Sequence, residues 1–281
     1  MMNHPLVSVV VTTYCSAEYL EKCLASIRSQ TYKNIELVVV DTNSTDCTQE
    51  IAEKYADKCF FGQANERSAK RNFGARQATG KYVLIVDSDM CLSLDVVGAC
   101  VSAILYDECI KAVVVPERST GTSFWAKCKS IERSFYVGVD WMEAARFFER
   151  DIFLEVGGYD EGNTGSEDYD LPQRVKEKYG KGSIGWIDKF ITQDEVDLSL
   201  IKSCKKKFYY ASSFPKYASN AANAGNFKKQ SSLLRRYHLF LSQPRKLFET
   251  PGVGIGMLFM KTCEFAAGSM GYILARLGCR K

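Results

Sequence analysis

Acidic residues gather at two places in this sequence of 281 residues, and both groups could do chemistry. The first is the triplet of Asp87, Ser88 and Asp89, which directly follows the apolar run 82–86. Carboxylate oxygens suit Mg²⁺ or Mn²⁺, and such an ion would neutralise a diphosphate and stabilise it as a leaving group. A D-x-D triplet alone is a weak signal, but its place at the end of a predicted buried strand strengthens it. The alternative, an Asp that only caps the next turn, suits one of the two better than both.

The second group comprises Glu167, Asp168 and Asp170, three acids within four residues. Such carboxylates repel one another unless a cation, a proton or a substrate compensates them. A purely stabilising role is therefore not expected. A carboxylate at this place can act as a general base if it lies within hydrogen-bond reach of an acceptor hydroxyl.

Asp41 follows a second apolar run, 35–40, and precedes Ser44 and Asp46, either of which could cap a helix. Because Asp41 lies before that cap, its carboxylate is expected to be free to accept from a base or a ribose. The three cations of 67–71 fall within one and a half helical turns. They could meet phosphates or base edges, or simply lie on the surface.

The elements that must position these residues are predicted by strand and helix patterns that alternate along the sequence. Short β-branched runs, typical of buried parallel strands, alternate with stretches whose apolar residues recur at helical spacing. The predicted strands are 6–13, 35–40, 58–61, 82–86 and 112–116, and the predicted helices are 16–30, 45–55, 67–78, 94–106, 123–136 and 150–156. This order predicts a doubly wound, mostly parallel (Rossmann-like) α/β sheet, with ligands at the carboxyl ends of its strands.

Charge is distributed unevenly along the chain. Residues 201–281 contain fifteen Lys and Arg against only Glu249 and Glu264, although the whole chain has a net charge of +4. We therefore expect a catalytic domain over 1–200 and a basic, amphipathic helical extension over 201–281. Lys261 interrupts the apolar stretch 251–278, so no run reaches the about 20 residues that span a bilayer. Interfacial helices on an anionic membrane are expected; the alternative is a buried helix of the core or of a dimer interface.

The eleven cysteines are scattered and never show C-x-x-C spacing, which predicts neither a zinc site nor a redox pair. They are interpreted as buried, reduced thiols. The first residues lack the pattern of a secretory signal. We therefore expect a cytoplasmic protein that associates peripherally with a membrane.

Several segments taken together resemble the family 2 glycosyltransferases, which have the GT-A fold. They are VSVVVTTY from Val7, QTY from Gln30, VVVD ending at Asp41, KRN from Lys70, DSD from Asp87, GGYDE from Gly157 and EDYDL from Glu167. They occur in the family's order over about residues 6–195, and their joint pattern is highly specific.

The resemblance implies an inverting transfer of a sugar from a nucleotide-sugar, UDP- or GDP-linked, with Mn²⁺ or Mg²⁺. The resemblance also implies that Asp168 would be the base and that Asp87 and Asp89 would hold the metal. The residues implied in donor binding are Thr13, Tyr14, Asp41, Arg71, Asp87 and Ser88, and those on the acceptor side are Gly158, Glu167 and Asp170.

Four positions depart from the family's usual pattern. Thr12 replaces a Pro, Cys15 an Asn, Thr42 the second Asp of a D-D pair, and Gln193 a His that many relatives use near the metal and diphosphate. The first three bear on the identity of the base, and Gln193 bears on the affinity for metal.

The basic tail and its KKKFYY segment at 205–210 resemble membrane-associated members that act on lipid-linked acceptors. The expected partners are thus a polyprenyl or dolichyl phosphate, or a lipid-linked saccharide, and an anionic membrane surface. No nucleic acid is expected, and assembly into a homo-oligomer stays open.

Three other classes of protein were weighed. A nicotinamide oxidoreductase would need G-x-G-x-x-G after the first strand, and a sugar nucleotidyltransferase would need a glycine-rich basic loop there; the chain has neither. The third is a non-catalytic or weakly active membrane-associated module that binds nucleotide-sugar or glycan. The missing His favours this third class, whereas the intact D-S-D and E-D-Y-D segments oppose it.

Overall fold

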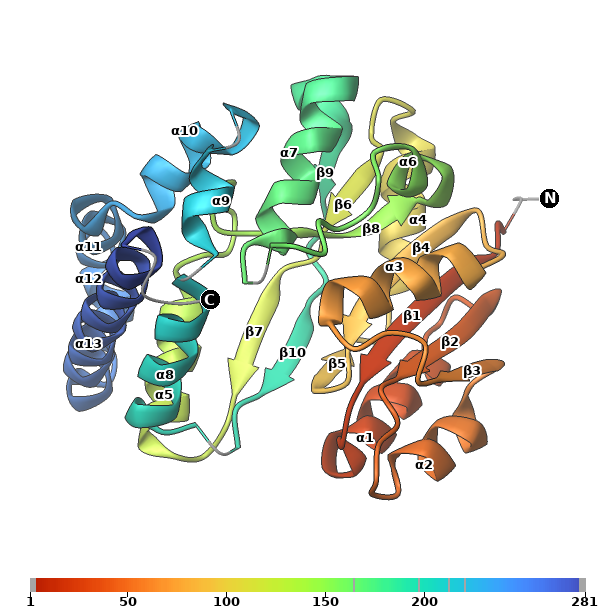
Figure 1. Ribbon diagram of the computed structural model, residues 1–281, viewed down its shortest axis with the longest axis horizontal. Helices are drawn as coiled ribbons and strands as arrows, with labels where there is room; N and C mark the ends of the chain where they lie inside the picture. Colours follow the sequence, from red (N-terminus) through yellow and green to blue (C-terminus); the bar gives the residue numbers. More distant parts are fainter. Residues whose placement is uncertain (1–3, 164, 197, 212, 220, 278–281) are drawn as a thin grey trace. The chain divides into compact units, whose positions relative to one another are not determined.

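The computed structural model describes residues 4–163, 165–196, 198–211, 213–219 and 221–277 (Figure 1). Two compact units make up the chain. The first contains Met1–Pro116, Ala144–Glu161 and Leu171–Gln193, and the second contains Glu117–Glu143, Gly162–Asp170 and Asp194–Lys281. The segment 201–281 therefore does not form a unit by itself, because 117–143 and 162–170 belong with it.

A seven-stranded sheet in the order β3-β2-β1-β4-β8-β6-β9 forms the centre of the first unit. Its strands are β1 (Val7–Thr13), β2 (Ile35–Asp41), β3 (Lys58–Phe61), β4 (Tyr82–Asp87), β6 (Ala112–Val114), β8 (Ala145–Glu149) and β9 (Ile184–Trp186). β1 runs parallel to β2 and β4, β2 runs parallel to β3, and β6 runs parallel to β9. Only β8 is antiparallel to its neighbours, β4 and β6. The prediction of a mostly parallel α/β sheet is confirmed.

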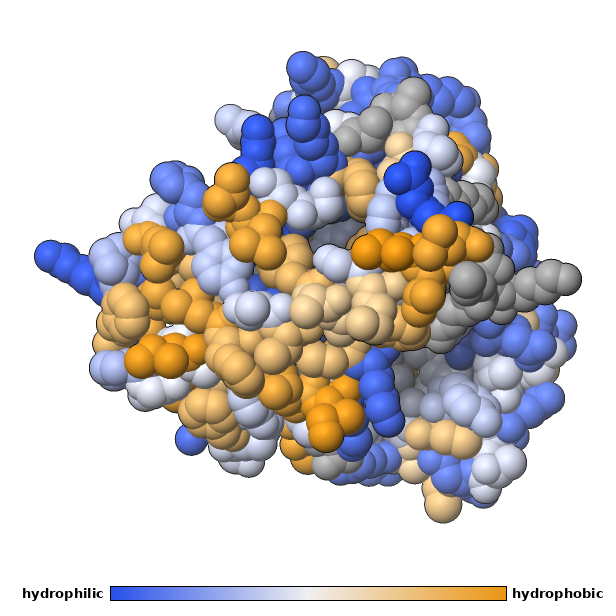
Figure 2. All heavy atoms as spheres, turned by 60° about the vertical axis from the view of Figure 1, so that its left-hand side comes forward, coloured by the Kyte–Doolittle hydropathy of each residue, from blue (hydrophilic) through white to orange (hydrophobic). Residues whose placement is uncertain are grey.

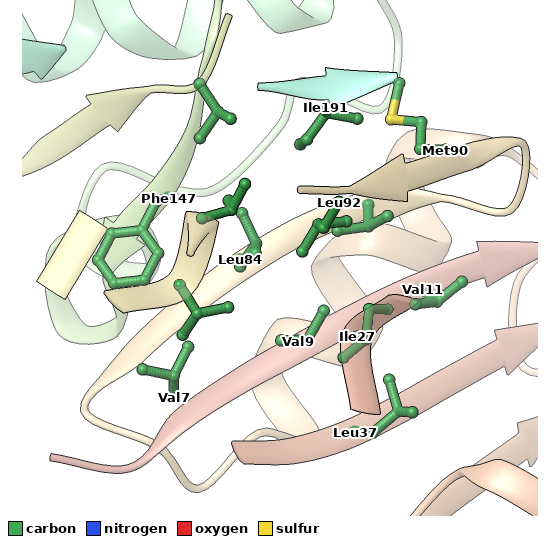
Figure 3. Close-up of a cluster of buried hydrophobic side chains, with 14 of the residues drawn as sticks. Val7, Val9, Val11, Ile27, Leu37, Leu84, Met90, Leu92, Phe147 and Ile191 are labelled. Atoms are coloured by element: carbon green, nitrogen blue, oxygen red, sulfur yellow. The ribbon is translucent and has the colours of Figure 1, made fainter. Parts of the chain in front are cut away.

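Both faces of this sheet are buried, which explains why its strands have continuous apolar runs. Val7, Val9 and Val11 point into one core, whereas Val10 points into the other, because successive side chains alternate across a strand. Figure 3 shows the first core, where Val9 and Val11 lie near Ile27 of a covering helix.

Helices cover each face. The first core includes residues of α1 (Ala17–Arg28), α2 (Thr48–Tyr55) and α4 (Val96–Tyr106). The second core includes residues of α3 (Arg67–Gln77), α6 (Arg150–Glu155) and the later turns of α7 (Glu167–Tyr179). A short 3₁₀ turn, η1 (Lys181–Ser183), precedes β9. The predicted helices of this unit are thus present within a few residues of their expected bounds.

The second unit is mainly helical. It contains β7 (Glu117–Thr120), α5 (Phe124–Ser134), α8 (Leu200–Ala211), α9 (Phe214–Ser219), α10 (Ala221–Gln230), α11 (Leu233–Leu241), α12 (Pro244–Phe248) and α13 (Pro251–Arg276). Helix α13 packs against α8 and α5. A small core around Phe135, Phe240, Leu247 and Met257 joins α5, α11, α12 and α13. Within the described residues, no helix combines the length and the apolar character that a membrane span requires.

Candidate functional site

Polar residues meet at the carboxyl ends of three neighbouring strands. In the parallel ladders, Thr13 at the end of β1 lies opposite Asp41, and Thr12 lies opposite Asp87. The hydroxyl of Thr13 is buried, and no described residue hydrogen-bonds to it. A buried polar atom without a partner is costly, so an unsatisfied hydroxyl at this edge suggests a place for a ligand. The exposed ring of Tyr14 follows directly.

Asp87 is held by a buried arginine. Arg71 of α3 donates from Nη2 to both carboxylate oxygens of Asp87, at 2.7 and 2.6 Å. Nη1 of Arg146, on β8, lies 3.9 Å from Oδ2 of Asp87. Burial alone would raise the pKa of Asp87, but the guanidinium groups of Arg71, Arg146 and Arg67 outweigh it and hold that pKa well below its usual range. Asp87 is therefore an ionised acceptor at neutral pH and cannot donate a proton there.

Asp89 lies in the turn that leads from β4 to β5 (Met90–Leu92), and it meets the residue that replaces the family's usual His. Strand β5 pairs antiparallel with β10 (Ile191–Asp194), with Met90 opposite Gln193. Nε2 of Gln193 donates to Oδ2 of Asp89 at 2.7 Å. Ser88, between the two acids, hydrogen-bonds to the hydroxyl of Ser16 at 3.0 Å.

The residues around Asp89 fit a hard divalent ion only as part of a larger set of ligands. No group of three or more His, Cys, Asp or Glu that could hold a metal occurs among the residues that the structure describes. Asp89 and the amide oxygen of Gln193 could supply oxygen ligands. Mg²⁺ binds in this way, through one or two carboxylates together with phosphate oxygens and water. The donors therefore fit an ion that arrives with a diphosphate.

Lysine and arginine of the KRN segment are buried, so of the two alternatives that the sequence left open, a surface position is excluded for Lys70 and Arg71. Lys70 donates from Nζ to the carbonyl oxygen of Thr13 at 2.8 Å, and Arg71 is fully buried against Asp87. Helix α3 thereby ties the ends of β1 and β4 together. Cations that face a strand end cannot be told from surface cations by helical spacing alone.

Asn72, the third residue of that segment, fixes the loop that follows α6. It donates to the carbonyl oxygen of Tyr159 at 2.8 Å and accepts from the backbone N–H of Tyr159, also at 2.8 Å. Gly158 has a φ of +63°, and a Cβ there would lie 2.4 Å from Oδ1 of Asn72. Only glycine fits this close approach. The predicted acceptor-side role of Gly158 is not tested by this contact.

Asp41 is not free, which corrects the expectation from sequence. Its carboxylate accepts from the backbone N–H of Ser44 at 2.7 Å and from the Ser44 hydroxyl at 2.5 Å. Side-chain oxygens of Asp commonly close turns in this way. Ser44 does not cap α2; instead Asp46 accepts from the N–H of Thr48 at 3.2 Å and from that of Ala17 at 3.3 Å. The implied donor-binding role of Asp41 stays a prediction.

The second acidic group opens helix α7 and belongs to the second unit. Glu167 accepts from the backbone N–H of Gly165, and Oδ1 of Asp170 accepts from Nδ2 of Asn223 at 2.5 Å. Both are nearly fully buried, whereas Asp168 is half-buried. The N-terminus of a helix also favours negative charge. Glu167 and Asp170 thus hold hydrogen bonds within the fold, their implied acceptor-side roles stay predictions, and the carboxylate most open to solvent among the three is that of Asp168.

Arg146 is the main residue that the sequence analysis missed. It lies in β8, which was not predicted, because the strand has only five residues, ARFFE, with charged residues at its second and last positions. The signal available in the sequence was the position of Arg146, a cation placed between apolar residues. Its guanidinium lies near Asp87, which places a second positive charge beside the site.

The sequence model described as Glycosyl transferase family 2 matches residues 8–162, which is more than half of the chain. The chain belongs to glycosyl transferase family 2. The matched region contains the three strand ends, helix α3 and the loop that Asn72 holds. The resemblance stated from the motifs is confirmed.

Two curated relatives each match about a third of the chain. Glycosyltransferase GlyA of Streptococcus pneumoniae is 43% identical over 102 residues, which are 34% of this chain and 15% of GlyA. An uncharacterized glycosyltransferase of Haemophilus influenzae is 37% identical over 100 residues, 34% of this chain and 40% of that protein. The chain thus covers less than half the length of these relatives.

Solved structures of the GT-A fold resemble the whole chain. Mannosyltransferase PcManGT from Pyrobaculum calidifontis, in complex with GDP-Man and Mn²⁺, has a TM-score of 0.60 at 19% identity and covers 98% of this chain and 86% of its own. Staphylococcus aureus TarS 1-349 in complex with UDP-GlcNAc has a TM-score of 0.54 at 16% identity, covering 97% and 92%. At such identities the likeness establishes the GT-A fold, as predicted.

Proposed function

We propose that this family 2 protein transfers a sugar from a nucleotide-sugar donor to a lipid-linked acceptor. The observation that carries the proposal is the carboxylate of Asp87, held by two hydrogen bonds from Arg71 at the carboxyl ends of the central strands. Ligands of doubly wound sheets bind at such edges. GDP-Man in PcManGT and UDP-GlcNAc in TarS are donors of the proposed class.

Donor binding is assigned to the strand ends. Asp87 presents an anionic acceptor to ribose hydroxyls, and the unpaired hydroxyl of Thr13 supplies a further polar contact beside it. Tyr14 is exposed and can cover a base by stacking. Ser88, Asp41 and Arg71 complete the implied donor set; Arg71 acts through Asp87, whose orientation it fixes.

A divalent ion, Mn²⁺ or Mg²⁺, is assigned first to Asp89. The two carboxylate oxygens of Asp87 already accept from Arg71, which leaves Asp89 the better donor of the pair, with Gln193 beside it. When bound, the ion neutralises charge on the departing diphosphate. Mn²⁺ in the PcManGT complex is consistent with this assignment.

Asp168 is assigned as the base for an acceptor hydroxyl. It takes the hydroxyl proton while the oxygen attacks the anomeric carbon and the bond from that carbon to the diphosphate breaks, with inversion. The bonding electrons leave with the diphosphate. Glu167 and Asp170 flank this base on the acceptor side and already hold hydrogen bonds of their own.

A lipid-linked acceptor, such as a polyprenyl or dolichyl phosphate or a lipid-linked saccharide, is supported by the second unit. Segment 201–281 is strongly basic, and its helices share a unit with α5. Positive charge of this kind attracts a protein to anionic lipid. We therefore place the enzyme peripherally at the cytoplasmic face of a membrane. Assembly into a homo-oligomer stays a prediction.

A panel of UDP- and GDP-sugars, each with and without Mn²⁺, tests the donor assignment by thermal shift. A ligand that binds the native state raises the midpoint of unfolding by mass action. We expect one nucleotide class to raise it for the wild type and for Asp151→Asn, a change at a side chain that is 95% exposed. Asp87→Asn should abolish the rise. If no nucleotide-sugar shifts the wild type, the proposal is overturned.

A further inference from the structure

Helix α13 carries two of its three charged residues on its buried side. Lys261 is 5% exposed and Glu264 is 2% exposed. Nζ of Lys261 lies 2.5 Å from Oε1 of Glu132, on α5, and 2.7 Å from Oε2 of Glu264. These charged groups satisfy one another, which is the condition under which charges are tolerated in a core. The charged residues that interrupt the apolar stretch thus face inward.

The solvent side of α13 is uncharged over most of its length. Exposed or half-exposed positions recur every three or four residues along it. We call the following six residues the outer stripe: Ile255, Phe259, Thr262, Ala266, Met270 and Ile273. Four of them are large apolar side chains that are 55–62% exposed. The first charged residue on this side is Arg276, so the uncharged surface is about 30 Å long at 1.5 Å per residue.

A helix at the surface of a globular protein normally turns polar residues to water and apolar residues inward. Helix α13 instead exposes apolar residues along its solvent side, while its buried side holds Met257 and Met260 as well as the charged Lys261 and Glu264. Figure 2, in which the side of the molecule with α11, α12 and α13 comes forward, shows apolar side chains gathered over this face with hydrophilic ones around it. An apolar surface of this size marks a place of contact with another apolar surface.

Charge identifies the partner. The outer stripe lies in a segment whose exposed cations include Lys205 and Lys206 of α8, Arg235 of α11 and Arg245 of α12. Glu249 is the only exposed acid among the described residues after 200. Two copies of so basic a segment would repel each other face to face, whereas an anionic surface would attract it. An exposed apolar helix face within a strongly basic segment is the pattern of helices that lie in the headgroup region of a membrane.

We propose that the outer stripe is a membrane-docking surface, and that α13 lies in the plane of a bilayer containing anionic lipid with these side chains inserted. The inference rests on the proposed function, because it names the surface through which that enzyme would reach a lipid-linked acceptor. It adds that α13 contributes by insertion of apolar side chains as well as by charge.

Binding of the full chain to vesicles of phosphatidylcholine and phosphatidylglycerol tests the proposal. The stripe variant carries Ile255→Glu, Phe259→Glu and Ile273→Glu. The control variant carries Leu94→Glu, Leu105→Glu and Tyr106→Glu, exposed apolar positions of the first unit. Each variant adds three negative charges, so the two lose the same net charge. Circular dichroism and thermal unfolding confirm that each is folded.

We expect the stripe variant to bind vesicles about tenfold or more weakly than the control. The three introduced glutamates would oppose insertion into the bilayer, and the apolar contact between the stripe and the lipid would be lost. Equal binding by the two variants would overturn the proposal. So would a wild type that is dimeric by light scattering and a stripe variant that is monomeric, because a second copy would then cover the stripe. Donor hydrolysis without vesicles reports the proposed function separately: its absence, with vesicle binding that depends on the stripe, would remove that function and leave the docking surface.

Discussion

Arg71 donates through one guanidinium nitrogen to both oxygens of Asp87, and its side chain has no exposed surface. The pair joins α3 to the end of β4, so one interaction serves the fold and the site together. It also fixes the charge of Asp87, since the arginines around it hold its pKa far below the ordinary range of a carboxyl.

Removal of Arg71 should therefore destabilise the protein. Arg71→Met leaves the carboxylate of Asp87, whose side chain is 17% exposed, without its main partner, and loss of one partner of a largely buried ion pair costs about 3 kcal/mol. Chemical denaturation measures the loss in the free energy of unfolding. Lys54→Met is the matched control, because it removes an ion pair with Glu21 whose side chains are half or more exposed, and it should change stability little. A similar loss in the two variants would contradict the structural role of the buried pair.

The same pair predicts how stability depends on pH. The folded-state pKa of Asp87 is lowered, so its contribution is present above the unfolded-state pKa, about 4, and is lost as pH falls below that value. The difference in unfolding free energy between wild type and Asp87→Asn should be largest at neutral pH and shrink as the medium becomes more acidic than about pH 4. A difference that stays constant down to the acid transition would show that Asp87 is not ionised in the native state.

Gly158 should tolerate substitution less well than its neighbour. Gly158→Ala places a Cβ 2.4 Å from Oδ1 of Asn72 at a φ of +63°. Gly157→Ala has a similar φ of +84°, but its Cβ would meet only Nη1 of Arg174, at 4.0 Å. Comparison of the two melting temperatures separates the clash from the backbone strain that they share. We expect Gly158→Ala to melt several degrees lower, and equal melting would show that the loop does not approach Asn72 closely.

Gln193 offers a test of the metal assignment. Gln193→His would place an imidazole beside Asp89, and a neutral imidazole is a common metal ligand that would add to the oxygen ligands of the ion. Titration of Mn²⁺ in the presence of the nucleotide diphosphate should show binding about fivefold or more tighter than wild type. Thr192→His, at the adjacent position of β10, is the control and should bind as wild type does, because neighbouring side chains of a strand face opposite ways. Unchanged affinity in Gln193→His would place the ion elsewhere.

Much of the first unit could be predicted from sequence, for reasons that lie in single elements. Runs such as 35–40 and 82–86 are buried on both faces, so their apolar character alone indicated the strands and placed Asp41 and Asp87 at their ends. The hydrogen bonds of Asp41 could not be foreseen, because they depend on the path of the following loop through Ser44.

Other contacts could not be predicted because the two residues that form them lie far apart in the sequence. Lys261 is satisfied by Glu132, which lies 129 positions earlier, so nothing near it in sequence showed that it would face inward. Asp170 likewise meets Asn223 across 53 positions. Helix α13 is buried on one side and exposed on the other, so the alternative of a buried helix holds for one side only, and the interfacial location stays a prediction.

Turnover of a nucleotide-sugar donor by Asp168→Asn tests the central claim most directly. The wild type and Asp151→Asn should turn over at the same rate, and Asp168→Asn should lose about 100-fold or more in kcat because a general base is removed. Its donor affinity should be unchanged, since the donor is assigned to the strand ends. Turnover by Asp168→Asn at the rate of the wild type would contradict the account.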